Sequence, residues 1–132
     1  MKGLIALLAV FLPVSAGAQP NRLTAEERKE GYVLLFNGKD LKGWEGDPAY
    51  WSVKDGAIVG STHRQPLKTS TFLVGKRAFS DFILKIDIRL LSGNSGIQFR
   101  STAGPGWQMT GYQADASDAG PKSAWGNLYE MN

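Results

Sequence analysis

The longest regular alternation in this sequence runs from Asp81 to Leu91. Apolar side chains occupy the even positions: Phe82, Leu84, Ile86, Ile88 and Leu90. Charged side chains occupy three of the odd positions: Lys85, Asp87 and Arg89. A period of two residues is that of a β-strand and not of a helix. The pattern predicts a long strand with one face buried in a core, where each apolar side chain would contribute about 1.5–3 kcal/mol.

Other stretches predict a mostly β fold. Residues 51–54 and 57–59 flank Asp55-Gly56, a pair that favours the two-residue turn of an antiparallel hairpin. Residues 71–74 are a short apolar run typical of another strand. The exception lies near the N-terminus, where Thr24 precedes two acidic residues and predicts the N-cap of a short helix that ends at Gly31.

Two further alternations carry recognition chemistry. Gln98 and Arg100 alternate with Ile97 and Phe99, and Gln113 and Asp115 alternate with Tyr112, Ala114 and Ala116. The amide, guanidinium and carboxylate groups should therefore lie opposite the apolar face, where they could recognise hydroxyls and oxyanions. If the two strands pair, cross-strand neighbours lie about 5 Å apart, and Arg100 and Asp115 could share one pocket. The alternative is a surface salt bridge worth under about 1 kcal/mol.

Three ring-bearing residues in or near loops are further candidates. Trp107 lies in a Gly-Pro-Gly-Trp loop and is either a stacking platform for a sugar or a lid over the end of the fold. Trp125 is a second candidate for stacking. His63, the single histidine, lies in a polar loop over residues 61–70, where a solvated role is favoured over a catalytic one.

The N-terminus has the composition of a secretory signal. Lys2 supplies a positive charge, residues 4–12 are apolar, and Ala16-Gly17-Ala18 offers a cleavage site before Gln19. We therefore expect a signal peptide over residues 1–18, a polar segment over 19–30 and one domain over 31–132, in a secreted or periplasmic protein. The apolar run is too short for a membrane span, which needs about 20 residues.

The composition limits the cross-links that can stabilise the fold and the partners that the protein can bind. The chain contains no cysteine, so neither a disulfide nor a lipoprotein cysteine is available. The net charge is only +3 and the basic residues form no stripe, which argues against nucleic acid as a partner.

Several short motifs of this sequence, in the same order along the chain, resemble those of the 3-keto-disaccharide hydrolase domain family of secreted bacterial proteins. They are residues 35–44, the 51–56 hairpin, residues 71–74, residues 79–82, residues 94–100 and residues 111–115. Together they span about residues 30 to 130. The resemblance implies an all-β, concanavalin-like jelly-roll β-sandwich of two antiparallel sheets, with a site for a carbohydrate on its concave face.

A sandwich must cover both faces of its core with sheets, and family members continue for several more strands. Because the chain stops just as Tyr129 opens a strand, we expect the domain to be truncated at its C-terminus. Many members also carry Glu where this chain has Gln113.

The resemblance also implies a chemistry. A ketone at C3 of a glycoside acidifies the C2 hydrogen, so a general base can remove that proton while the C1 substituent leaves with help from an acid. On this hypothesis Asp115 is the base, Arg100 holds the enolate or a hydroxyl, and Tyr129 or His63 is the acid. Substrate hydroxyls would be oriented by the amides of Asn94, Gln98 and Gln113. The alternative is a non-catalytic carbohydrate-binding module of the same shape, which would use Trp107 or Trp125.

A divalent cation is a possible cofactor of such a site. Asp115, Asp118 and Glu130 carry the oxygen ligands that a hard cation prefers, although their spacing matches no ligand motif. With one His and no Cys, a structural zinc site is not expected.

Overall fold

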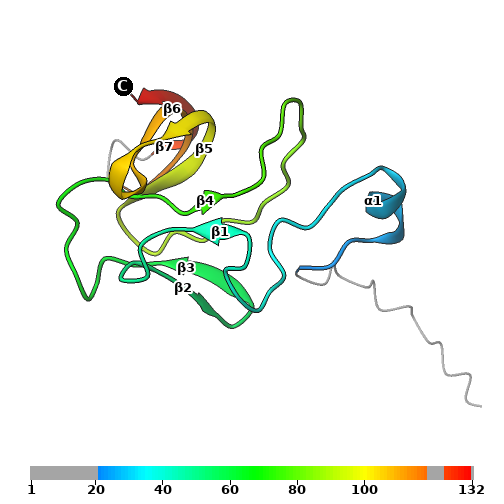
Figure 1. Cartoon of the computed structure of the whole chain (residues 1–132), viewed down its shortest axis with the longest axis horizontal. Helices are drawn as coiled ribbons and strands as arrows, with labels where there is room; N and C mark the ends of the chain where they lie inside the picture. The colour runs from blue at the N-terminus through cyan, green and yellow to red at the C-terminus, as the bar shows by residue number, and fades with distance from the viewer. Residues whose placement is uncertain (1–20, 119–123, 132) are drawn as a thin grey trace, which may run out of the picture. The chain divides into compact units, whose positions relative to one another are not determined.

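The computed structural model describes residues 21–118 and 124–131 (Figure 1). The chain divides into two units, Met1–Leu34 and Leu35–Asn132. The described part of the first unit holds the helix, and the second unit holds the strands, all of them in antiparallel sheets. The all-β class is therefore confirmed. The expected signal peptide lies outside the described residues, and within them no helix has the length and apolarity needed to cross a membrane.

Helix α1 (Ala25–Lys29) begins at the predicted cap. Thr24 Oγ1 accepts a hydrogen bond from the Glu27 backbone N–H at 3.1 Å, and the Glu27 carboxylate accepts one from the Thr24 N–H at 2.9 Å. This reciprocal pair satisfies two of the free N–H groups at the start of the helix. Gly31, with φ of 85°, follows the helix in the left-handed conformation that glycine adopts most easily.

The hairpin predicted around Asp55-Gly56 is confirmed. Strands β2 (Trp51–Lys54) and β3 (Ala57–Gly60) pair antiparallel, with Lys54 opposite Ala57. Asp55 and Gly56 have φ of 51° and 75°, as a two-residue turn with two left-handed positions requires. A second small sheet joins β1 (Trp44–Glu45) to β4 (Val74–Gly75), so the strand expected over 71–74 is shorter than predicted.

The largest sheet has the order β5-β6-β7. Its strands are β5 (Asn94–Ala103), β6 (Met109–Ser117) and β7 (Ala124–Met131), and the 3₁₀ helix η1 (Pro105–Trp107) joins the first two. Figure 1 shows the three strands side by side in yellow, orange and red. Gln98 lies opposite Gln113, and Gln113 lies opposite Tyr129. This register decides which side chains share a face.

The long strand predicted between Asp81 and Leu91 is wrong. The structure assigns no strand there, and Phe82, Leu84, Ile86 and Ile88 are 38–55% exposed instead of buried. Alternation makes a segment suitable for a sheet, but a strand also needs a neighbour whose backbone groups pair with its own. None of the described strands pairs with this segment.

Little of the described chain is fully buried. Ala116 is the one buried hydrophobic residue among the described positions, and Ile97 and Phe99 are half-buried. The predicted parity of these two residues is nevertheless confirmed, because Ile97 lies opposite Ala114 and Phe99 opposite Tyr112, with the two rings stacked 6.3 Å apart. The described strands form three small antiparallel sheets, and a two-sheet jelly roll stays a prediction.

Candidate active site

The register gathers polar side chains on one face of the β5-β6-β7 sheet. Directly opposed residues of antiparallel strands point to the same side. Gln98, Gln113 and Tyr129 therefore form one row across the three strands, and Asp115, opposite Gly96, lies in the next row. Asn94 begins the same face on β5, two rows from Gln98. We call this surface the amide face; it carries five predicted site residues, Asn94, Gln98, Gln113, Asp115 and Tyr129.

A directed chain of hydrogen bonds crosses the amide face. The Ser101 hydroxyl donates to Gln98 Oε1 at 2.7 Å, Gln98 Nε2 donates to Gln113 Oε1 at 3.1 Å, and Gln113 Nε2 donates to Asp115 Oδ1 at 2.6 Å. Each amide uses its oxygen on one side and its nitrogen on the other. An ionised carboxylate accepts hydrogen bonds and donates none, so Asp115 fixes the direction in which both amides point.

Gln113 is the most buried of the four hydrogen-bonded residues, with 6% of its surface exposed. Burial of an amide is tolerated when its groups are paired, and here the side-chain oxygen and nitrogen both have partners. The side chain passes over Gly96, where a Cβ atom would lie 2.6 Å from Gln113 Cγ and Cδ. Glycine at position 96 therefore makes the space through which Gln113 reaches Asp115.

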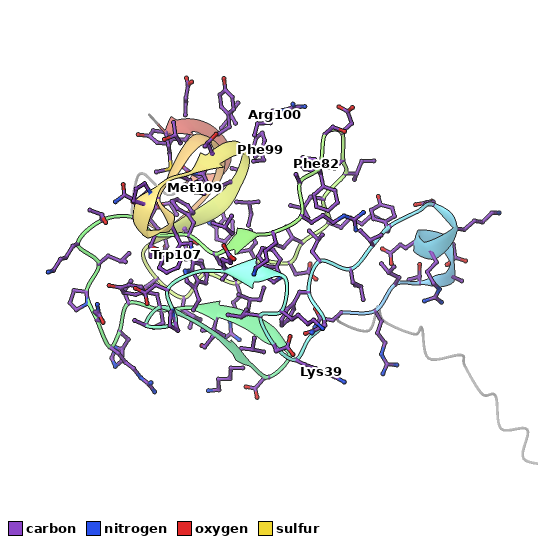
Figure 2. All side chains as sticks on the ribbon, viewed as in Figure 1. Lys39, Phe82, Phe99, Arg100, Trp107 and Met109 are labelled. Atoms are coloured by element: carbon purple, nitrogen blue, oxygen red, sulfur yellow. The ribbon has the colours of Figure 1, made fainter. Side chains whose placement is uncertain are left out.

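A β-bulge separates Arg100 from Asp115, so the shared pocket expected for them is not formed. The register shifts between Phe99 and Thr102, which leaves Arg100 and Ser101 opposite Gly111. Gly111 lies four residues from Asp115 along β6, about 13 Å at the usual rise per residue. Arg100 adopts a φ of 48° and its side chain is exposed (Figure 2). The extra residue brings Ser101 to Gln98, where simple alternation had placed Arg100.

Trp125 lies on the opposite face of the sheet from the amides. It pairs with Ala116, which belongs to the apolar set of β6, and it is 53% exposed. Glu130 pairs with Tyr112 and shares that opposite face. A second irregularity in β7, between the partners of Ala114 and Ala116, contains Gly126 with φ of 72°.

Trp107 and His63 lie away from the amide row. Trp107 ends η1 half-buried, and its backbone carbonyl accepts a hydrogen bond from Phe72 N–H at 2.9 Å (Figure 2). His63 is exposed in the 61–70 loop, where its backbone N–H donates to Ser61 Oγ at 3.2 Å. Neither ring makes a contact with Gln98, Gln113 or Asp115 among the described interactions.

A cavity of about 340 Å³ adjoins the amide face. Its lining includes Thr69 from the 61–70 loop and Gln108 from between η1 and β6, together with Met109 and Met131 from the sheet. Gln98 Nε2 lies 2.7 Å from Met131 Sδ, so Met131 borders both the amide chain and the cavity. The volume is at the lower end of the range for small-ligand sites, about 300–1,000 Å³.

The carboxylates suggested as cation ligands are not brought together. Within residues 21–118 and 124–131, no group of three His, Cys, Asp or Glu side chains is placed to hold a metal ion. Glu130 lies on the opposite face from Asp115. The chemistry that the amide face offers is therefore hydrogen-bond recognition by amides and a hydroxyl, beside one carboxylate able to accept a proton.

Comparison with known proteins decides the family. A family model described as the 3-keto-alpha-glucoside-1,2-lyase-like domain matches residues 31–132. The chain belongs to this family. Neither curated proteins nor solved structures give a match to the chain. The keto-glucoside lyase-like family suggests a carbohydrate as the substrate.

Three contributors to the lyase-like domain's amide face were missed by sequence reasoning. Gly96 carried a usable signal, because an isolated glycine inside a strand pattern often marks a close approach by another group. Ser101 and Met131 carried none: the first reaches Gln98 only through the bulge, and the second is positioned by the pairing of Gly111 with Met131.

Proposed function

We propose that this protein cleaves 3-keto-glucosides by proton abstraction at C2 and elimination at C1, with Asp115 as the general base. The family match supports the substrate class. The observation that carries the choice of base is the hydrogen-bond chain ending on Asp115 Oδ1. Among the described residues, Asp115 is the one carboxylate on the amide face, and its Oδ2 accepts no hydrogen bond there, so that oxygen is available to a substrate.

The chemistry follows from the 3-keto group. Asp115 takes the C2 proton, and the electron pair of the C2–H bond forms an enolate that extends over C2, C3 and the C3 oxygen. The C1–O bond then breaks, and the departing alcohol takes a proton from an acid, for which Tyr129 is the candidate on the same face. Water adds at C1 and a proton returns to C2, which completes a net hydrolysis. General-base catalysis of this kind contributes about 10²–10⁴-fold in rate.

The neighbouring amides act on the substrate's hydroxyls and on Asp115. Gln113 holds one carboxylate oxygen at 2.6 Å, which orients the other toward an incoming C2–H. Asn94, exposed on the same face, would contact a ring hydroxyl. Arg100 and His63 are second candidates for the enolate clamp and the acid, and each would need substrate-induced movement to reach C2.

Such an enzyme would be an exported carbohydrate-active domain. We propose that residues 31–132 belong to a concanavalin-like jelly-roll sandwich and that residues 1–18 direct the chain to the periplasm or the exterior. The supports are the antiparallel sheets and the composition of the N-terminus.

Asp115→Asn tests the assignment. The asparagine can still accept the hydrogen bond from Gln113, so the site keeps its shape and loses its base. We expect release of 3-keto-glucose from a 3-keto-disaccharide to fall at least about 100-fold, while the Kd for the sugar changes little. Asp55→Asn, in the exposed turn between β2 and β3, is the control and should keep full turnover. Unchanged turnover in Asp115→Asn would refute the base, and binding without turnover in the wild type would favour the carbohydrate-binding module.

A further inference from the structure

The Ser101 hydroxyl lies at the far end of the hydrogen-bond chain from Asp115. Its Oγ atom is 2.7 Å from Gln98 Oε1 and 2.8 Å from the carbonyl oxygen of Phe99. A hydroxyl has one proton to donate, so these two acceptors compete for it. Gln98 Oε1 has no other donor among the described residues, because the remaining hydrogen bonds of Gln98 are made by its Nε2. The orientation of the Gln98 amide therefore depends on Ser101 at this end of the chain.

The β-bulge that brings Ser101 to Gln98 depends on glycine at position 111. Arg100 and Ser101 both lie opposite Gly111. A Cβ atom at position 111 would clash with Ser101 Oγ and would lie 2.7 Å from both the Arg100 carbonyl oxygen and Ser101 Cα. Gly111 also has a φ of 142°, a conformation that residues with a side chain rarely adopt. Bulges next to active sites re-aim a side chain, and here the redirected side chain is that of Ser101.

Loss of the Ser101 hydroxyl would affect both amides of the chain. Gln98 Nε2 faces Gln113 Oε1, so Gln98 Oε1 has to find its donor on the Ser101 side. An acceptor that is buried without a donor is unfavourable, and Gln98 is half-buried, so its amide would turn toward water and leave Gln113 Oε1 without a donor as well. Hydrogen bonds in a chain polarise and strengthen one another. The bond from Gln113 to Asp115 would therefore weaken too.

We propose that Ser101 is a positioning residue of this site. It acts through Gln98 and Gln113 to hold the Asp115 carboxylate in one orientation, from about 13 Å away along the sheet. Its effect on turnover rests on the proposed function, in which Asp115 is the base. Its effect on the Asp115 side chain does not.

Ser101→Ala removes the hydroxyl and leaves the rest of the side chain in place. We expect kcat for a 3-keto-disaccharide to fall about three- to tenfold, the effect of one neutral hydrogen bond, and KM to stay within about twofold of wild type, because the hydroxyl orients the base. Ser95→Ala is the matched control and should keep the wild-type kcat, since Ser95 is exposed on the same strand and lies opposite Ala116, on the other face of the sheet. An unchanged kcat in Ser101→Ala, or a rise in KM alone, would overturn the proposal.

A double-mutant cycle tests whether Ser101 acts through Gln98. Gln98→Met keeps the length of the side chain and removes its amide. In the Gln98→Met background, Ser101→Ala should lower kcat by less than about twofold, because the amide through which the hydroxyl acts is already gone. An equal loss in both backgrounds would show that Ser101 affects turnover by another route, and it would refute the positioning role.

NMR separates this proposal from the proposed function. The carboxyl carbon of Asp115 and the side-chain amide of Gln113 each give a signal, and neither group is bonded to Ser101 in the described structure. Ser101→Ala should shift both signals, and Ser95→Ala should shift neither. A wild-type chain that leaves the keto-sugar intact would refute the proposed function, while the two shifts would still support the control of Asp115 by Ser101. Unshifted signals in Ser101→Ala would refute that control even in an active enzyme.

Discussion

Adding one methyl group at Gly96 should break the hydrogen-bond chain on the amide face. A Cβ atom there would lie 2.6 Å from Cγ and Cδ of Gln113 and 2.8 Å from the carbonyl oxygen of Ala114. The second neighbour is backbone of β6 and cannot move without shifting the strand. Gln113 must therefore swing away, and its hydrogen bonds with Gln98 and Asp115 are lost.

The size of the effect follows from those two bonds. A neutral hydrogen bond contributes about 0.5–1.5 kcal/mol and one to a charged group about 1.5–3 kcal/mol. Replacement of glycine by alanine returns about 0.4–1 kcal/mol through the unfolded chain. We therefore expect Gly96→Ala to lower the free energy of unfolding by about 1–4 kcal/mol. With a slope near 2 kcal/mol per molar urea, the midpoint should fall by about 0.5–2 M.

Urea unfolding followed by tryptophan fluorescence measures the shift, and Gly104→Ala is the matched control. At Gly104 a Cβ would meet only the carbonyl oxygen of Gln108, at 3.8 Å, and φ is −106°. That variant should show no fall in the midpoint, and a rise of up to about 0.5 M through the unfolded chain. Gly96→Ala with an unchanged midpoint and unchanged sugar affinity would show that the contact between Gly96 and Gln113 does not organise the site.

Three other changes have expected outcomes. Gln113→Glu places a second carboxyl beside Asp115, and repulsion and burial raise the pKa of the new group in the folded state. The folded state then binds more protons than the unfolded state, so the urea midpoint of this variant should fall as pH rises from 5 to 7.5. The hydrogen bond from the Asn37 side chain, followed by that from the Lys42 N–H, holds the pKa of Asp40 below its ordinary value of 3.8. The stability contributed by Asp40 is thus present above that value and lost as pH falls through the lowered pKa; an NMR titration should give a midpoint below 3.8, and Asn37→Ala should raise it. Arg100→Gly removes a non-glycine residue from φ of 48° and should raise the free energy of unfolding by about 0.5–1 kcal/mol, measured in urea.

Local chemistry made parts of the fold predictable. Asp55-Gly56 specifies its turn with two adjacent residues, and Thr24 with Glu27 specifies the start of the helix. Such signals need no distant partner, so the sequence contains all of the information. The row of Gln98 and Gln113 was predictable for a related reason, because parity along two strands fixes a shared face once they pair.

The predictions that were wrong depend on which strands pair over long distances in the sequence and in which register. The alternation over residues 82–90 suits a strand in its side chains, but no sequence pattern within the segment states which strand would pair with it, and the described structure assigns no strand there. The position of Arg100 was predicted wrongly because one extra residue in β5 shifts the register beyond Phe99. The sequence marks this bulge only by Gly111 on the opposite strand, which adopts a φ of 142°. Trp125 was misplaced in the same way, since its face depends on its pairing with Ala116.

Exchange of the C2 hydrogen of a 3-keto-glucoside tests the central claim most directly. In heavy water, a protein that removes the C2 proton incorporates deuterium at C2 before or alongside cleavage, and NMR resolves that position. We expect the wild-type chain to exchange C2 well above the rate in buffer, and Asp115→Asn to exchange it at least about 100-fold more slowly than wild type while still binding the sugar. Exchange by Asp115→Asn at the wild-type rate would contradict the assignment of the base, and a bound keto-sugar that the wild type leaves unexchanged would contradict catalysis on this face.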